Sequence, residues 1–207
     1  MSTPKLIDST PFNPLIVKVH YDGFDWEKLK PVCEEMINGA KYSVDLEQNG
    51  GRSSVYNHNN QPHESKAFTD FYKFLQPIAK HIIFNEWKLA KAFEYRISNS
   101  WVNVHKRHGL TSEHNHAASV LVCATYLQLP ENGGYIQFKD PLEYHKLFHQ
   151  REELDDCDWY TVPAKTGDIL IFPGWINHRT QPSNSDEERW VLTTNFVNMN
   201  RPPNTTY

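Results

Sequence analysis

Two histidines separated by a single residue, and a third much farther along the chain, are the residues whose types and spacing could do chemistry. His114 and His116 form the pair, and His178 ends the stretch Phe172 to His178. If Glu113 to Ala117 is a strand, side chains two residues apart share a face, so both imidazoles can face one ion. Neutral imidazole is a common ligand of iron, copper, nickel and zinc, and three of them leave coordination positions open for substrate. The pattern predicts a metal centre whose ligands are His114, His116 and His178.

An arginine 11 residues after the third histidine could anchor an anion. The guanidinium of Arg189 is always charged, and its planar fork can meet a carboxylate at two points. The sequence also permits a simpler interpretation, an exposed arginine paired with the neighbouring residues Asp186 to Glu188. We keep both, because the local sequence does not choose between them.

Short apolar, β-prone runs separated by glycine-rich turns must position these residues. Ser119 to Leu127 and Tyr135 to Phe138 flank a turn with two adjacent glycines, which predicts a hairpin. Ile169 to Phe172 follows another turn, and Arg189 to Val197 alternates between apolar and polar residues. Strands of this kind, with a histidine near each end of the series, favour a mainly β fold: a small antiparallel jelly roll or cupin-like barrel.

The first ninety residues are predicted to support that barrel. Leu15 to His20 is a good strand, and Asp25 is a plausible N-cap for the first of two helices. Two helices packed on one face of a jelly roll would bury both apolar stripes. The stripes consist of Trp26, Leu29, Cys33, Met36 and Ile37, and of Phe68, Phe71, Leu75, Ile78 and Ile82. We therefore expect one domain over residues 1–207, with 1–94 as support and 95–198 as the core that carries the metal site.

Composition excludes several classes of protein. The formal net charge of -4 provides no general attraction to nucleic acid. Three widely spaced cysteines, Cys33, Cys123 and Cys157, favour a reducing compartment over a disulfide scaffold. No segment approaches the ~18 apolar residues that span a bilayer, and no secretion signal is apparent. We expect a soluble, cytoplasmic protein without a membrane partner, and we keep a homodimer open beside a monomer.

Six short motifs in a fixed order carry a resemblance to a known family. Over roughly residues 95 to 198 the chain resembles the Fe(II)- and 2-oxoglutarate-dependent oxygenases, particularly a small group found in bacteria and in their phages. Each motif alone is weak, but their shared order is specific. The motifs are Trp101-Val102-Asn103, His114 to Ser119, Tyr126-Leu127, Phe138 to Pro141, Gly167 to His178, and Arg189 to Asn195.

The resemblance implies a fold, cofactors and further site residues. The fold would be a double-stranded β-helix with two supporting helices, and the cofactors Fe(II), 2-oxoglutarate and O2. Arg189 would hold the distal carboxylate of 2-oxoglutarate, with the Tyr126 phenol as a second donor or, alternatively, a plain core aromatic. Asn103, Ser119 and Asn195 lie on presumed inward faces and could reach the remaining oxygens.

The second histidine departs from the family pattern, in which the matching residue is usually a carboxylate. A centre of three histidines would leave the charge of the ion uncompensated and strengthen its hold on an anionic co-substrate. Two alternatives remain at this stage. Water or a halide could fill the position while His116 turns away, or Glu113 or Asp140 could supply a carboxylate from a neighbouring loop.

The function that the resemblance implies is oxidation of a C–H bond. Oxidative decarboxylation of 2-oxoglutarate would release succinate and CO2 and yield a hydroxylated substrate. That substrate could be a peptide, an amino acid, a nucleobase or a small metabolite, in the host cytoplasm if the gene is from a phage. A three-histidine dioxygenase that does not use 2-oxoglutarate and a non-catalytic binding module are the competing classes. Two further histidines, His105 and His108, are expected at a solvated loop mouth, with substrate contact as the alternative.

Overall fold

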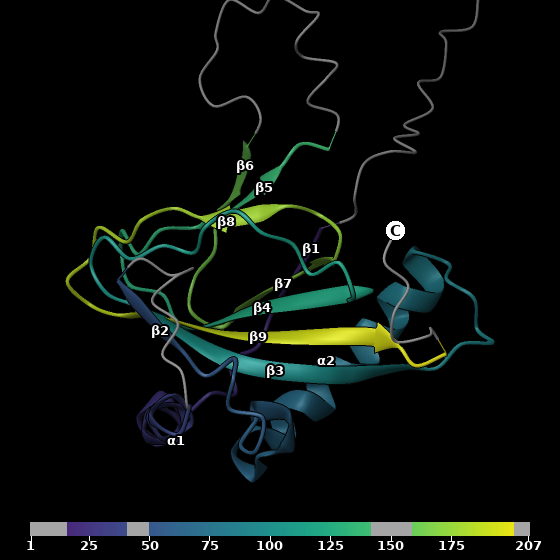
Figure 1. Cartoon of the computed structure of the whole chain (residues 1–207), viewed down its shortest axis with the longest axis horizontal. Helices are drawn as coiled ribbons and strands as arrows, with labels where there is room; N and C mark the ends of the chain where they lie inside the picture. The colour runs from purple at the N-terminus through teal and green to yellow at the C-terminus, as the bar shows by residue number, and fades with distance from the viewer. Residues whose placement is uncertain (1–15, 41–49, 142–158, 201–207) are drawn as a thin grey trace, which may run out of the picture.

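Two antiparallel sheets face each other in the computed structural model, which describes residues 16–40, 50–141 and 159–200 (Figure 1). The strands are β1 Val17–His20, β2 Gly51–Ser53, β3 Tyr95–His105, β4 Leu121–Gln128, β5 Ile136–Lys139, β6 Trp159–Val162, β7 Asp168–Pro173, β8 His178–Thr180 and β9 Arg189–Asn198. The larger sheet has the order β1-β7-β4-β9-β3-β2, and the smaller sheet has the order β6-β5-β8. This is the double-stranded β-helix, or jelly roll, that the sequence predicts.

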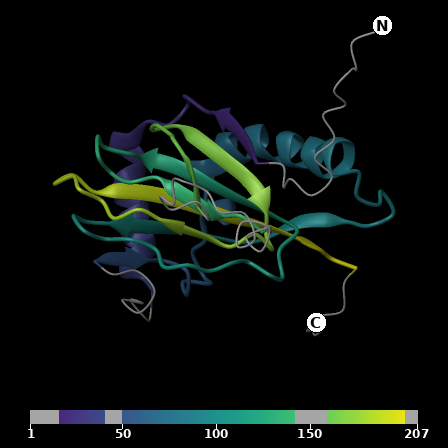
Figure 2. The same ribbon diagram turned by 90° about the horizontal axis from the view of Figure 1, so that it is seen from above.

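Both predicted helices form, and both cover the outer face of the larger sheet. Helix α1 spans Trp26–Asn38, and the side chain of Asp25 accepts a hydrogen bond from the Lys28 amide at its start. Helix α2 spans Thr69–His81 and continues into a π-helical turn. Seen from above, α1 crosses the strands, whereas α2 runs along them (Figure 2). In the part of the chain that the structure describes, no helix has the length and apolarity needed to cross a membrane.

The central strands of the larger sheet are buried on both faces. On β4, Cys123 and Leu127 pack into the core shared with the helices, while Ala124 and Tyr126 pack into a second core between the two sheets. Successive side chains of a strand point to opposite faces, so one strand serves both cores. The inner core is small, and the metal-centre histidines lie beside it.

The predicted hairpin between Ser119 to Leu127 and Tyr135 to Phe138 is wrong. The two runs are strands, but β4 pairs with β7 and β9, whereas β5 pairs with β6 and β8 in the other sheet. The turn between them carries the chain from one sheet to the other. Local alternation of apolar residues is the same in a hairpin and in a crossover, so only the burial of β4 between β7 and β9 distinguishes the two.

The N-terminal support also contributes to the barrel itself. Strand β1 extends the larger sheet by pairing with β7, and β2 extends the opposite edge by pairing with β3. Residue Leu15 of the predicted first strand lies outside the described residues, as does Cys157. Cys33 and Cys123 are buried free thiols, and burial raises the pKa of the Cys33 thiol to about 12.

Candidate metal centre and anion pocket

An isolated antiparallel bridge, rather than a strand, positions the first and third histidines. The backbone N–H of His114 donates to the carbonyl of His178 at 3.0 Å, and the N–H of His178 donates to the carbonyl of His114 at 2.9 Å. Their ring centroids are 4.2 Å apart. The expectation that Glu113 to Ala117 is a strand is therefore wrong, because only His114 pairs, as an isolated bridge. The pairing is nevertheless strand-like at that one position, and it brings together two residues far apart in the sequence.

A tight turn against the β7–β8 loop positions the remaining histidine. The backbone N–H of His116 donates to the Gly174 carbonyl at 2.7 Å, and its ring centroid lies 5.1 Å from that of His114 and 5.2 Å from that of His178. A Cβ on Gly174 would lie 2.1 Å from the carbonyl oxygen of Ser119. Only glycine permits this close approach of the two backbones.

The three histidines offer ligand nitrogens that lie within 4.8 Å of one another. In each ring Nδ1 is committed to an oxygen acceptor: the Ser112 carbonyl at 2.8 Å for His114, the Asn195 Oδ1 at 2.9 Å for His116, and the Ile176 carbonyl at 3.0 Å for His178. A ring that donates from Nδ1 carries its free lone pair on Nε2. The hydrogen bonds therefore select the same tautomer three times, as expected for rings that bind a metal.

Burial keeps the rings of His116 and His178 neutral, which is the state that binds a metal. Burial, with a smaller effect of neighbouring His114, lowers the pKa of His116 to about 4. Burial also lowers the pKa of His178 well below its usual value, again with His114 as a further cause. The indole of Trp101 lies nearly parallel to the His116 ring, with the centroids 5.7 Å apart. This contact holds the ring orientation, and the sequence analysis had not singled out Trp101 for it.

The two carboxylates considered as alternative ligands do not join the cluster. Within residues 16–40, 50–141 and 159–200, the groups of three or more potential ligand residues contain only the three histidines. Glu113 instead accepts a hydrogen bond from Asn177 at 2.9 Å and lies 3.5 Å from the Lys139 ammonium. His116 faces the other two rings rather than turning away. The donor set of three imidazoles fits a divalent transition-metal ion such as Fe(II).

A cavity of about 120 Å³ extends from the three histidines to Arg189. Arg189 is fully buried, so the interpretation as an exposed, salt-bridged residue is wrong. Its Nη1 donates to the carbonyls of Gly133, Gly134 and Gln181 at 2.7–3.2 Å. Burial lowers the pKa of Arg189 to about 10, which leaves the guanidinium charged at neutral pH. A buried cation with no carboxylate among these contacts favours an anion in the cavity.

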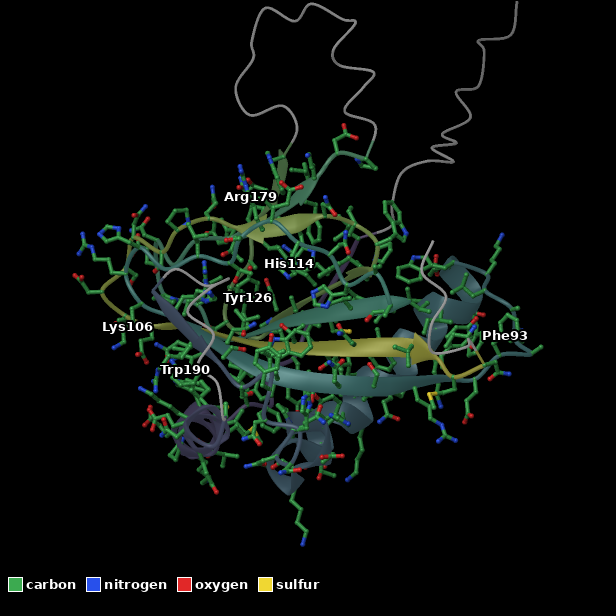
Figure 3. The ribbon with its side chains drawn as sticks, viewed as in Figure 1. Phe93, Lys106, His114, Tyr126, Arg179 and Trp190 are labelled. Carbon is green, nitrogen blue, oxygen red and sulfur yellow. The ribbon has the colours of Figure 1, made fainter. Side chains whose placement is uncertain are left out.

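The other predicted cofactor residues fall in different places. Tyr126 and Asn103 line the cavity, and the Tyr126 hydroxyl accepts from the Ile136 amide at 3.2 Å, which leaves its own hydrogen available. Asn195 bonds to His116 instead. Ser119 lies in the turn after His116, outside the cavity lining. Figure 3 shows His114 and Tyr126 between the two sheets.

The expectation that His105 lies at a solvated loop mouth is wrong. His105 is the last residue of β3, only 1% exposed, and it lines the same cavity as Arg189. His108, three residues later, is exposed as expected and adopts a positive φ of 66°. The alternation along β3 decides the difference, because Val104 faces the helices and His105 therefore faces inward.

Comparisons with known proteins agree with this geometry. The family model described as "Putative 2OG-Fe(II) oxygenase" matches residues 99–195. HygX from Streptomyces hygroscopicus, solved with nickel, 2-oxoglutarate and hygromycin B, is similar in fold, with a TM-score of 0.59 and 11% identity over 89% of this chain and 83% of that one. A prolyl-4-hydroxylase from Pseudomonas putida has a TM-score of 0.56 and 13% identity over 88% and 91%. Comparison with curated protein sequences returns no match.

A further structural neighbour is SnoK, a non-heme alpha-ketoglutarate-dependent carbocyclase from nogalamycin biosynthesis, with a TM-score of 0.56 and 14% identity over 87% of this chain and 78% of that one. The TM-scores show that these proteins share the fold, and the low identities limit the conclusion to the fold. The fold and the cluster of three histidines define a double-stranded β-helix protein with a candidate metal centre. The family model, which matches slightly less than half of the chain, and these neighbours make the chain similar to the 2OG-Fe(II) oxygenases.

Proposed function

We propose that the protein is a non-haem Fe(II)- and 2-oxoglutarate-dependent oxygenase that hydroxylates a C–H bond of its substrate. In the balanced reaction, 2-oxoglutarate, O2 and the substrate give succinate, CO2 and the hydroxylated product. One oxygen atom enters succinate, and the other enters the product. The substrate class remains a prediction: a peptide, an amino acid, a nucleobase or a small metabolite.

One observation supports the proposal above the others. Three imidazoles, each with Nδ1 already donating to an oxygen, meet at one end of a cavity whose other end holds a buried arginine. A metal at the first end and a dicarboxylate reaching the second would satisfy both features. Neither a purely structural metal site nor a metal-free binding module requires the buried cation.

Each group of residues has a distinct role in this proposal. His114, His116 and His178 would hold Fe(II), which supplies the O2 chemistry that protein side chains lack. Arg189 would bind and orient the distal carboxylate, with the Tyr126 hydroxyl as a further donor. The apolar walls of the cavity, which include Val122, Ile136, Phe172 and Val191, would exclude water and so strengthen these polar contacts.

The first test is calorimetric titration of the purified protein with Fe(II) under argon, followed by 2-oxoglutarate. We expect one ion per chain, and 2-oxoglutarate binding only after iron has been added. The His178→Ala variant should lose iron affinity by more than the ~10–100-fold that is typical when a residue hydrogen-bonded to a metal ligand is substituted. Circular dichroism checks that the variant is folded, and unchanged iron affinity in it would remove His178 from the centre.

Arg189→Lys tests the other end of the cavity. Lysine keeps the positive charge but loses the planar fork, so iron affinity should persist while 2-oxoglutarate affinity falls at least about tenfold. Succinate release, screened against candidate substrates, then tests turnover. A wild-type protein that binds iron but not 2-oxoglutarate would overturn the proposal and favour a three-histidine oxygenase of another kind.

A further inference from the structure

Two buried nitrogen atoms near the arginine end of the cavity have no hydrogen-bond partner in the described structure. They are Nδ1 of His105 and Nε of Arg189. The two residues are direct cross-strand partners on β3 and β9, and both line the cavity. A buried polar nitrogen without a partner costs about 1–3 kcal/mol, so such groups usually await a ligand or water. Two of them on cross-strand partners that line the same cavity point to a ligand in this part of it.

The hydrogen bond between His105 and Thr111 allows Nδ1 of His105 to be a donor. Its Nε2 lies 3.1 Å from the hydroxyl oxygen of Thr111. The charge of Arg189 lowers the pKa of His105, in addition to the larger effect of burial, so the ring is neutral. When the Thr111 hydroxyl donates to Nε2, the ring hydrogen must be on Nδ1. The unpartnered atom of His105 is then an N–H donor.

Arg189 by itself has little donor capacity left. Its Nη1 is committed to the carbonyls of Gly133, Gly134 and Gln181. Its Nη2 donates to the Thr180 hydroxyl at 3.0 Å and reaches the Gly109 carbonyl only at 3.5 Å. Nε and one weakly engaged hydrogen of Nη2 remain. A carboxylate has about four lone-pair positions, so it needs donors beyond this arginine.

We infer that His105 is a further binding residue for the distal carboxylate of the co-substrate, donating from Nδ1 next to its cross-strand partner Arg189. The inference rests on the proposed function, because it assigns a residue to the same 2-oxoglutarate pocket. It accounts for both unpartnered nitrogens with one ligand group. It also explains why a histidine is buried beside a cation, where an apolar side chain would avoid the burial of an unpaired N–H.

The test compares two ligands on the iron-loaded protein under argon: 2-oxoglutarate and 2-oxovalerate, which keeps the 2-oxo acid but lacks the distal carboxylate. Calorimetry gives the affinity of each for the wild type and for two variants. His105→Leu removes both ring nitrogens, whereas His105→Asn keeps an amide N–H near the position of Nδ1. We expect His105→Leu to weaken 2-oxoglutarate about tenfold or more and 2-oxovalerate by less than about threefold. His105→Asn should stay within about threefold of the wild type for both ligands.

The outcomes separate this inference from the proposed function. Equal 2-oxoglutarate affinity in wild type and His105→Leu would overturn the role of His105 while the oxygenase proposal stands. Equal losses for both ligands would also overturn it, since they would indicate a structural role. A wild type that does not bind 2-oxoglutarate would overturn the proposed function itself. If His105→Leu does not fold, His105→Asn and His105→Gln decide, because the Gln amide matches Nε2 and should lose affinity for 2-oxoglutarate alone.

Discussion

At the scale of single residues, the most unusual feature is an imidazole where the resembling family usually carries a carboxylate. His116 meets the other two ligands through a contact to the Gly174 backbone, and its Nδ1–H finds an acceptor in Asn195. An aspartate ligand would not need that acceptor. We therefore expect the histidine and the asparagine to work together, with Asn195 positioning His116 rather than contacting the co-substrate.

The first residue-scale prediction compares two substitutions at His116. His116→Ala should lower iron affinity sharply, because a ligand nitrogen is lost. His116→Asp should recover much of that affinity by restoring two histidines and one carboxylate, a set that suits non-haem iron. Recovery requires the Asn195 amide to flip, so that its NH2 rather than its oxygen faces the new carboxylate. Iron content and 2-oxoglutarate turnover of both variants provide the measurement.

Two results would contradict this prediction. If alanine leaves iron binding and succinate release unchanged, His116 is not a ligand. If aspartate binds iron no better than alanine, the side chain at position 116 cannot reach the ion with a shorter carboxylate. A second substitution, Asn195→Asp in the double variant with His116→Asp, should weaken iron binding again through repulsion between the carboxylates.

At the scale of elements, backbone contacts rather than a regular strand assemble the candidate metal centre. The turn after His116 and the β7–β8 loop touch at Gly174, and the bridge between His114 and His178 joins them a few residues away. A polar chain supports the same junction, in which Asn115 donates to Asn177 and Asn177 donates to Glu113. Displacement of either loop should therefore move a ligand.

The element-scale prediction concerns Gly174→Ala. The new Cβ would meet backbone oxygens at 2.1 and 2.7 Å, from Ser119 and His116, so the two loops must separate. We expect iron affinity to fall at least about tenfold and the thermal midpoint of the metal-free protein to drop by several degrees, in line with a cost of about 1–3 kcal/mol. Trp175→Ala is the matched control, because this neighbouring side chain is exposed and should not affect either quantity. A normal iron affinity in Gly174→Ala would show that the centre tolerates loop displacement.

At the scale of the whole molecule, several histidines are buried in the neutral state. Acid should therefore lower the free energy of unfolding. The pKa of His105 is lowered to about 3 by burial and by the charge of Arg189, against 6.5 in an unfolded chain. Stability from the neutral ring is fully present above pH 6.5 and is lost as the pH falls toward 3. Each pH unit in this window corresponds to at most about 1.4 kcal/mol.

The whole-molecule prediction follows from that sign. The free energy of unfolding of the metal-free protein, measured with urea at pH 7.5 and pH 4.5, should fall on acidification in the wild type. It should fall by about 1–2 kcal/mol less in His105→Asn, because asparagine does not titrate. The buried rings of His116 and His178 contribute losses of the same sign to both proteins, so the difference isolates His105. Equal losses in the two proteins would show that His105 does not remain neutral in the fold.

Much of the site could be predicted from the sequence. The pair His114 and His116, the distant His178 and Arg189 were predicted by residue type and spacing, and the structure brings all four to one cavity. Both helices and the apolar strands were also predictable, because burial of one or two faces leaves a periodicity that local sequence retains. Asp25 as an N-cap is visible in the same way, since capping depends only on the next few residues.

Only the tertiary structure decided which strands pair and which polar residues become buried. β4 and β5 look like a hairpin until β7 and β9 enclose β4. The local sequence does not distinguish His105 from His108. In the structure His105 lies inside the barrel beside Arg189, whereas His108 faces solvent. The physical reason is that strand pairing and burial depend on residues distant in sequence, whereas periodicity, capping and residue chemistry are local.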